Sequence, residues 1–118
     1  PRKFADQSPE ERMKEVRSIL LDIAKEQSVP LVDFHEHLVQ MKIADNQKES
    51  VIRNVANSGV NDGVHLTPRG YELLAQLIAE KIKTAKLPAS KVVCFGDSLT
   101  KGSAKANYPD YLDEILKR

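Results

Sequence analysis

The sequence predicts an α/β fold. Helical patterns of apolar residues alternate with two short apolar runs, residues 29–34 and 91–96, and such runs are typical of buried strands. The 118 residues give room for one domain of ordinary size. Hydrophobic residues make up 41 % and charged residues 30 %, which indicates a globular chain without a disordered or fibrous tract.

The first helix is predicted over residues 8–27. Ser8 and Glu11 form a capping box, and Pro9 takes the first helical position. Apolar residues then recur at spacings of three and four, which defines one apolar stripe. The stripe consists of Met13, Val16, Ile19, Leu20 and Ile23.

Four more helices complete the predicted pattern. Residues 34–55 contain two weak apolar repeats and predict two short helices, and residues 57–63 are turn-formers that predict a loop. Thr67 caps the fourth helix, and Pro109 begins the last. Two strands cannot form a sheet that covers five helices. The remaining strands would therefore come from another chain, another copy or a further segment.

The second predicted strand runs directly into Gly96, Asp97 and Ser98. In open α/β sheets, functional groups gather beyond the carboxyl ends of the strands. Gly96 allows a sharp backbone turn, and Ser98 would present both its hydroxyl and its backbone N–H, an oxyanion donor. An ordinary strand-to-loop turn also uses small polar residues of this kind.

Asp62 and His65 could supply the remaining groups of a nucleophilic site. A serine hydroxyl needs a base to take its proton, and the base needs an orienting carboxylate. His65 would be the general base, and Asp62 would hold its imidazole. In the alternative interpretation, Asp62 closes a turn and His65 bonds a backbone carbonyl near the helix start.

Together these two segments resemble the SGNH hydrolase superfamily, also called GDSL esterases and lipases. The motifs that carry the resemblance are Gly-Asp-Ser-Leu at residues 96–99 and Asp-x-x-His at residues 62–65. The resemblance implies a flavodoxin-like three-layer α/β/α sandwich, to which this chain contributes about two strands and five helices. It also implies ester hydrolysis through an acyl-enzyme, without a metal or organic cofactor.

The resemblance assigns a role to each motif residue. Ser98 is the nucleophile, His65 the general base, and Asp62 the residue that orients the base. Gly96 and Asp97 are structural residues beside the nucleophile. Because the sequence contains no helical lid, we expect the substrate to be a short acyl ester or an acetylated carbohydrate.

The motif order is the reverse of the family order. Residues 1–86 correspond to the end of a family domain, residues 91–118 to its beginning, and residues 87–90 to a linker. A circular permutation, a domain swap, or the end of one domain joined to the start of the next would produce this order.

Two family segments that donate hydrogen bonds to the oxyanion, one through a Gly and one through an Asn, are absent from the sequence. A complementary chain or a second copy would have to supply them, together with the missing strands. A catalytically silent assembly module that pairs through its sheet edges is the main alternative. The other is an unrelated helical binding protein in which both motifs are accidental.

Composition weighs against several other classes of function. Eighteen Lys and Arg against seventeen Asp and Glu give a net charge of +1, which predicts no nucleic-acid partner. No apolar run approaches the ~20 residues of a membrane span, and no signal peptide follows Pro1, so cytoplasmic and exported locations both stay open. The lone Cys94 excludes a disulfide scaffold. His35 and His37 follow a predicted strand and open a helix, so they suit solvated or capping positions better than metal binding.

Overall fold

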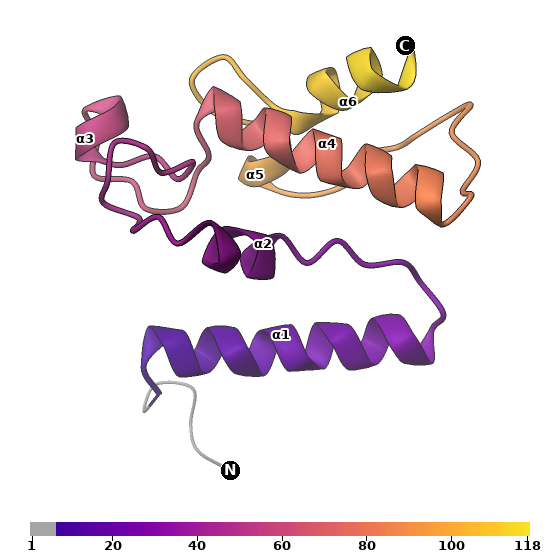
Figure 1. The fold of residues 1–118 in the computed structure, drawn as a ribbon, viewed down its shortest axis with the longest axis horizontal. Coiled ribbons are helices and arrows are strands. Elements are labelled where there is room, and N and C mark those ends of the chain that lie inside the picture. The colour runs from indigo at the N-terminus through magenta and orange to yellow at the C-terminus, as the bar shows by residue number, and fades with distance from the viewer. Residues whose placement is uncertain (1–6) are drawn as a thin grey trace. The chain divides into compact units, whose positions relative to one another are not determined.

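The computed structural model describes residues 7–118 (Figure 1). The chain divides into two compact units, Pro1–Leu31 and Val32–Arg118, and each is described by itself. The described residues form six helices. These are α1 (Pro9–Glu26), α2 (Phe34–Met41), α3 (Val55–Ser58), α4 (Pro68–Thr84), α5 (Ser98–Lys101) and α6 (Tyr108–Leu116).

The predicted α/β sandwich is wrong for this structure. Residues 7–118 contain no sheet, and their β pairings are the isolated bridges Ile52–Leu66 and Ser103–Ala106. Neither predicted strand forms: residues 29–33 lead irregularly into α2, and residues 92–96 have no regular structure. An apolar run favours extended backbone, but a strand also needs a neighbour for its N–H and C=O groups. The described residues provide neither run with such a neighbour.

Helix α1 begins where the sequence predicts. The Ser8 hydroxyl accepts the Glu11 amide at 3.2 Å, and the Glu11 carboxylate accepts the Ser8 amide at 2.9 Å. The predicted capping box is therefore confirmed. At the other end, the Gln27 amide donates to the Ile23 carbonyl at 2.9 Å. None of the residues of α1 is buried, and the residues of the predicted apolar stripe are exposed.

The core of the second unit forms around α4 and α6, which pack against each other (Figure 1). Helix α4 contributes Tyr71, which is fully buried, and Ala75, and helix α6 contributes Leu112. Val51 and Leu66, from the segments before α4, complete this core. Both helices begin close to the predicted positions, Thr67 and Pro109.

The region between α2 and α4 differs from the prediction. The expected second helix is absent, and the short helix α3 overlaps the expected loop 57–63. Asn54 explains the difference, because its side chain donates to the carbonyls of Asp45 at 2.6 Å and Gln47 at 2.8 Å and accepts the Asn57 amide at 2.9 Å. Side-chain bonds of this kind compete with the backbone bonds of a regular helix.

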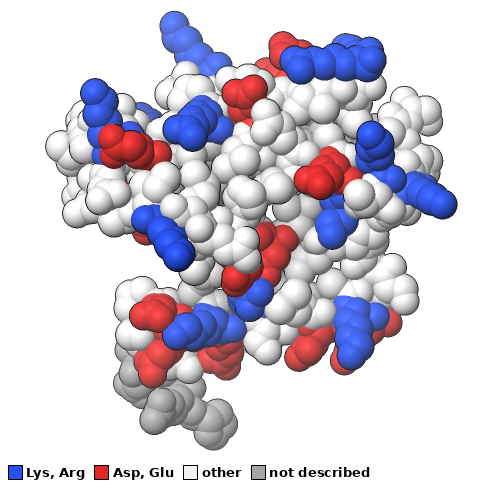
Figure 2. All heavy atoms as spheres, viewed as in Figure 1, with Lys and Arg blue, Asp and Glu red and all other residues white. Residues whose placement is uncertain are grey.

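Charged side chains of both signs are interspersed over the face of the molecule in Figure 2. That distribution agrees with the nearly neutral charge balance of the sequence. Among the helices of the described residues, none is long and apolar enough to cross a membrane.

Candidate active site

A short antiparallel pairing holds the Asp-x-x-His loop. The Thr67 amide donates to the Val51 carbonyl at 2.8 Å, and the Arg53 amide donates to the His65 carbonyl at 2.8 Å. The Gly63 amide donates to the Arg53 carbonyl at 2.9 Å. These three bonds fix the backbone on both sides of His65, directly before α4 begins.

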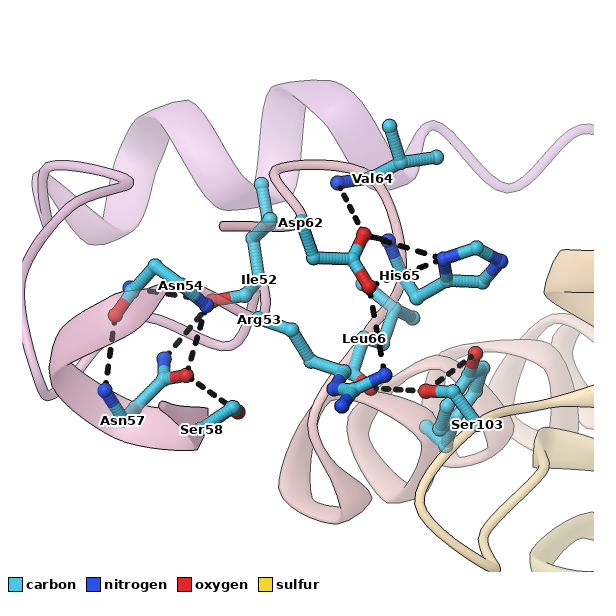
Figure 3. A network of polar contacts seen from close by, with 11 residues as sticks. Ile52, Arg53, Asn54, Asn57, Ser58, Asp62, Val64, His65, Leu66 and Ser103 are labelled. Carbon is cyan, nitrogen blue, oxygen red and sulfur yellow. Dashed lines mark hydrogen bonds and ion pairs between the residues drawn. The ribbon is translucent and has the colours of Figure 1, made fainter. Parts of the chain in front are cut away.

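The Asp62 carboxylate contacts both the backbone and the side chain of His65 (Figure 3). Its Oδ1 accepts the amides of His65 at 2.9 Å and Val64 at 3.0 Å. The His65 Nδ1 lies 3.1 Å from Oδ1 and 3.2 Å from Oδ2. Within residues 7–118, His65 Nε2 has no hydrogen-bond partner, and Figure 3 shows the outer edge of the ring turned away from the carboxylate. An Nδ1–H donated to Asp62 leaves the Nε2 lone pair facing outward, as a general base requires.

Hydrogen bonds lower the pKa of the Asp62 carboxyl below its ordinary value. The His65 backbone N–H makes the largest contribution, and the Val64 N–H and the imidazole add to it, while partial burial opposes them. Asp62 is consequently an ionised acceptor at neutral pH. An ionised carboxylate both selects the Nδ1–H tautomer and stabilises the imidazolium that forms when Nε2 takes a proton.

Arg53 is a further residue at this site that the sequence did not indicate. Its Nη1 lies 3.4 Å from Asp62 Oδ2 (Figure 3). The two side chains are 20 % and 15 % exposed, so the pair is only partly open to solvent. No motif marks Arg53, because the backbone pairing described above brings it to Asp62 from outside the Asp-x-x-His loop.

The Gly-Asp-Ser segment forms the start of α5. Asp97 is the N-cap, and its Oδ1 accepts the Leu99 amide at 2.9 Å. Ser98 is the first residue of α5 and is exposed. A Cβ on Gly96 would lie 2.1 Å from Thr100 Oγ1, so any side chain at this position would require Thr100 to move.

The structure does not join Ser98 to His65 by a hydrogen bond within residues 7–118. The contact between their segments runs through Ser103, whose hydroxyl donates to the Leu66 carbonyl at 3.0 Å (Figure 3). Asp62 and His65 thus meet directly, whereas the segment of Ser98 is connected to theirs through the Ser103 hydroxyl.

The described residues include no cluster of three or more His, Cys, Asp or Glu side chains that could hold a metal ion.

Comparison with known proteins identifies a family for the greater part of the chain. The sequence model of the family described as GDSL-like Lipase/Acylhydrolase matches residues 3–78, which is more than half of the chain. The matched range includes Asp62 and His65 and ends before Ser98. No curated protein and no solved structure matches the chain. The family description indicates ester hydrolysis in general terms, and the chain belongs to the GDSL-like lipase/acylhydrolase family.

Proposed function

We propose that the chain is a serine esterase that hydrolyses a short acyl ester or a carbohydrate O-acetyl ester. The observation that carries the proposal is the contact of Asp62 with His65 Nδ1 at 3.1 Å, with Nε2 left free among the described residues. That arrangement is how a carboxylate orients a general base. Family membership independently supports action on esters.

The proposed reaction proceeds through an acyl-enzyme. Ser98 Oγ attacks the ester carbonyl while His65 Nε2 takes the hydroxyl proton, and the imidazolium then gives this proton to the departing alcohol. Water next attacks the acyl carbonyl on Ser98 while His65 Nε2 takes its proton. The imidazolium then gives this proton to Ser98 Oγ as the acyl–oxygen bond breaks and the acid departs. Asp62 stays ionised throughout and stabilises the imidazolium.

The Ser98 backbone N–H is the proposed first oxyanion donor. It is the first amide of α5, and it has no acceptor within residues 7–118, whereas the Leu99 amide is occupied by Asp97. Further donors would come from a complementary chain or a second copy of this chain. One missing donor lowers turnover by ~10²–10³, so activity should increase when the partner is bound.

The exposed segment before Ser98 supports the existence of such a partner. Val93 is 78 % exposed and Phe95 is 97 % exposed, although both are apolar. Covering these side chains would remove apolar surface from water. We also propose that the chain is a permuted or swapped form of the family domain, because residues 1–86 and 91–118 carry the family motifs in reversed order.

The same exposed segment favours a second candidate function. A catalytically silent assembly module would use residues 91–96 to bind its partner and would not need Ser98 to reach His65. The two candidates differ in one respect that can be measured, which is whether ester hydrolysis depends on the Ser98 hydroxyl.

The test is hydrolysis of p-nitrophenyl acetate, p-nitrophenyl palmitate and an acetylated xylo-oligosaccharide by the whole chain. The serine esterase should act on the acetyl substrates and lose this activity in Ser98→Ala. Ser90→Ala, which changes an exposed serine upstream of the motif, should retain it. The absence of hydrolysis at any protein concentration, or an unchanged rate in Ser98→Ala, would favour the assembly module.

A further inference from the structure

A short path of covalent and hydrogen bonds connects His65 to Ser98. Leu66 follows His65 in the chain, and its carbonyl accepts the Ser103 hydroxyl at 3.0 Å (Figure 3). Gly102 precedes Ser103, and its amide donates to the Ser98 carbonyl at 2.9 Å. Two hydrogen bonds and two peptide links thus join the residues proposed as base and nucleophile.

The Leu66 carbonyl depends on Ser103 for a hydrogen bond. Leu66 is 6 % exposed, and the backbone pairing on either side of it uses the His65 carbonyl and the Thr67 amide. The first backbone bond of α4 goes from the Tyr71 amide to the Thr67 carbonyl at 3.0 Å, so the helix leaves the Leu66 carbonyl free. A buried carbonyl without a partner is costly, and the Ser103 hydroxyl removes that cost.

A tight turn fixes the position of Ser103. Ser103 and Ala106 exchange both backbone hydrogen bonds, each at 2.9 Å. Between them, Ala104 and Lys105 have φ values of 51° and 61°, which are unfavourable for residues with a side chain and persist only where the surroundings impose them. Gly102 has a φ of 90°, and a Cβ there would lie 2.0 Å from the Ala106 carbonyl oxygen.

We propose that Ser103 is a positioning residue that sets the placement of the Ser98 segment relative to the loop that carries His65. The proposal rests on the function proposed above. Ser103 acts through a backbone atom of the His65 loop, since its hydroxyl donates to the Leu66 carbonyl. The same hydroxyl accepts from the Tyr71 hydroxyl at 3.4 Å. Its loss should alter the geometry of the reacting groups without removing any of them.

Three variants of the full chain separate positioning from general stability. Ser103→Ala removes the hydrogen bond to the Leu66 carbonyl and should lower kcat for p-nitrophenyl acetate about tenfold, because small misplacements of reacting groups slow the reaction strongly. KM should stay unchanged. Ser103→Thr keeps a hydroxyl and should restore kcat. Tyr71→Phe removes only the longer bond, so it is the matched control and should behave like the unmodified chain.

Amide hydrogen exchange supplies a readout that does not require hydrolysis. In Ser103→Ala, exchange should accelerate in residues 62–67 and in residues 98–103 together, with α6 unaffected. Unchanged exchange in either segment would overturn the proposal, as would equal acceleration throughout α4 and α6 or an equal loss of kcat in Tyr71→Phe. If the unmodified chain hydrolyses no ester, the proposed function fails, and the exchange experiment alone decides whether Ser103 couples the two segments.

Discussion

Asp62 Oδ1 accepts the His65 amide at 2.9 Å and lies 3.1 Å from Nδ1 of the same residue. One carboxylate oxygen therefore fixes both the backbone of the loop and the orientation of the imidazole. The same oxygen also accepts the Val64 amide at 3.0 Å, so the loop turns back on the carboxylate within two to three residues. The conformation of the loop consequently depends on the charge of the Asp62 carboxylate.

Replacing Asp62 by Asn should weaken the dependence of folding stability on pH. The His65 amide and its neighbours lower the pKa of the Asp62 carboxyl in the folded chain, so the unfolded state binds more protons in acid. The stabilisation is complete above the unfolded carboxyl pKa of about 4 and is lost as the pH falls through the lower folded pKa. Asp62→Asn has no such carboxyl, and its stability should fall less steeply on acidification.

Urea unfolding followed by tyrosine fluorescence at a series of pH values measures this difference. All three tyrosines, Tyr71, Tyr108 and Tyr111, lie in the second unit with Asp62, so the signal reports on the relevant part of the chain. Asp22→Asn, at an exposed position of α1, is the control and should follow the unmodified chain. Equal slopes for Asp62→Asn and the unmodified chain would contradict the prediction.

Gly70→Ala should destabilise the second unit although alanine is the better helix former. A Cβ at position 70 would lie 2.6 Å from the Val51 carbonyl oxygen and 3.0 Å from Leu66 Cβ. The helix-propensity gain of about 1 kcal/mol is smaller than the cost of overpacking, and we expect a net loss of about 1–3 kcal/mol. Urea unfolding measures it, with Arg69→Ala at the exposed neighbouring position as control. A Gly70→Ala chain as stable as the original would show that α4 and residue 51 are not this close.

Asn54→Ala should cost about 1–3 kcal/mol, because it removes a buried amide side chain that satisfies several backbone groups. Asn54 is 9 % exposed, and its side chain bonds the Asp45 and Gln47 carbonyls and the Asn57 amide. The same substitution at the exposed Asn61 should change the free energy of unfolding by less than about 0.5 kcal/mol. Similar losses in the two variants, measured by urea unfolding, would refute the assigned role of Asn54.

The helices that the sequence predicted best are those with local end signals. Ser8 and Glu11 mark the start of α1, and Thr67 with Pro68 marks the start of α4. These signals act over three residues, so the local sequence is sufficient to predict where each helix begins. The predicted strands failed because strand pairing depends on a distant partner, which residues 29–34 and 91–96 do not have among the described residues.

In the candidate site, too, local contacts could be predicted from the sequence and contacts between distant segments could not. The Asp62–His65 contact depends on a local spacing, so the motif indicates which residues meet, and their catalytic roles stay proposals. Arg53 and Ser103 reach the site through backbone pairing and through a contact across 37 positions of the chain. No sequence pattern marks contacts of this kind.

Covalent labelling of the whole chain tests the proposed nucleophile most directly. The Ser98 Oγ should attack the phosphorus of a short-chain alkyl phosphonofluoridate, displace fluoride and remain bonded to phosphorus. Mass analysis of the tryptic peptide of residues 92–101 would locate the adduct. We predict an adduct on Ser98 that is absent in Ser98→Ala and forms more slowly in His65→Ala, because the imidazole takes the hydroxyl proton. An unlabelled peptide, while hydrolysis of p-nitrophenyl acetate persists in Ser98→Ala, would contradict the assignment of Ser98 as the nucleophile.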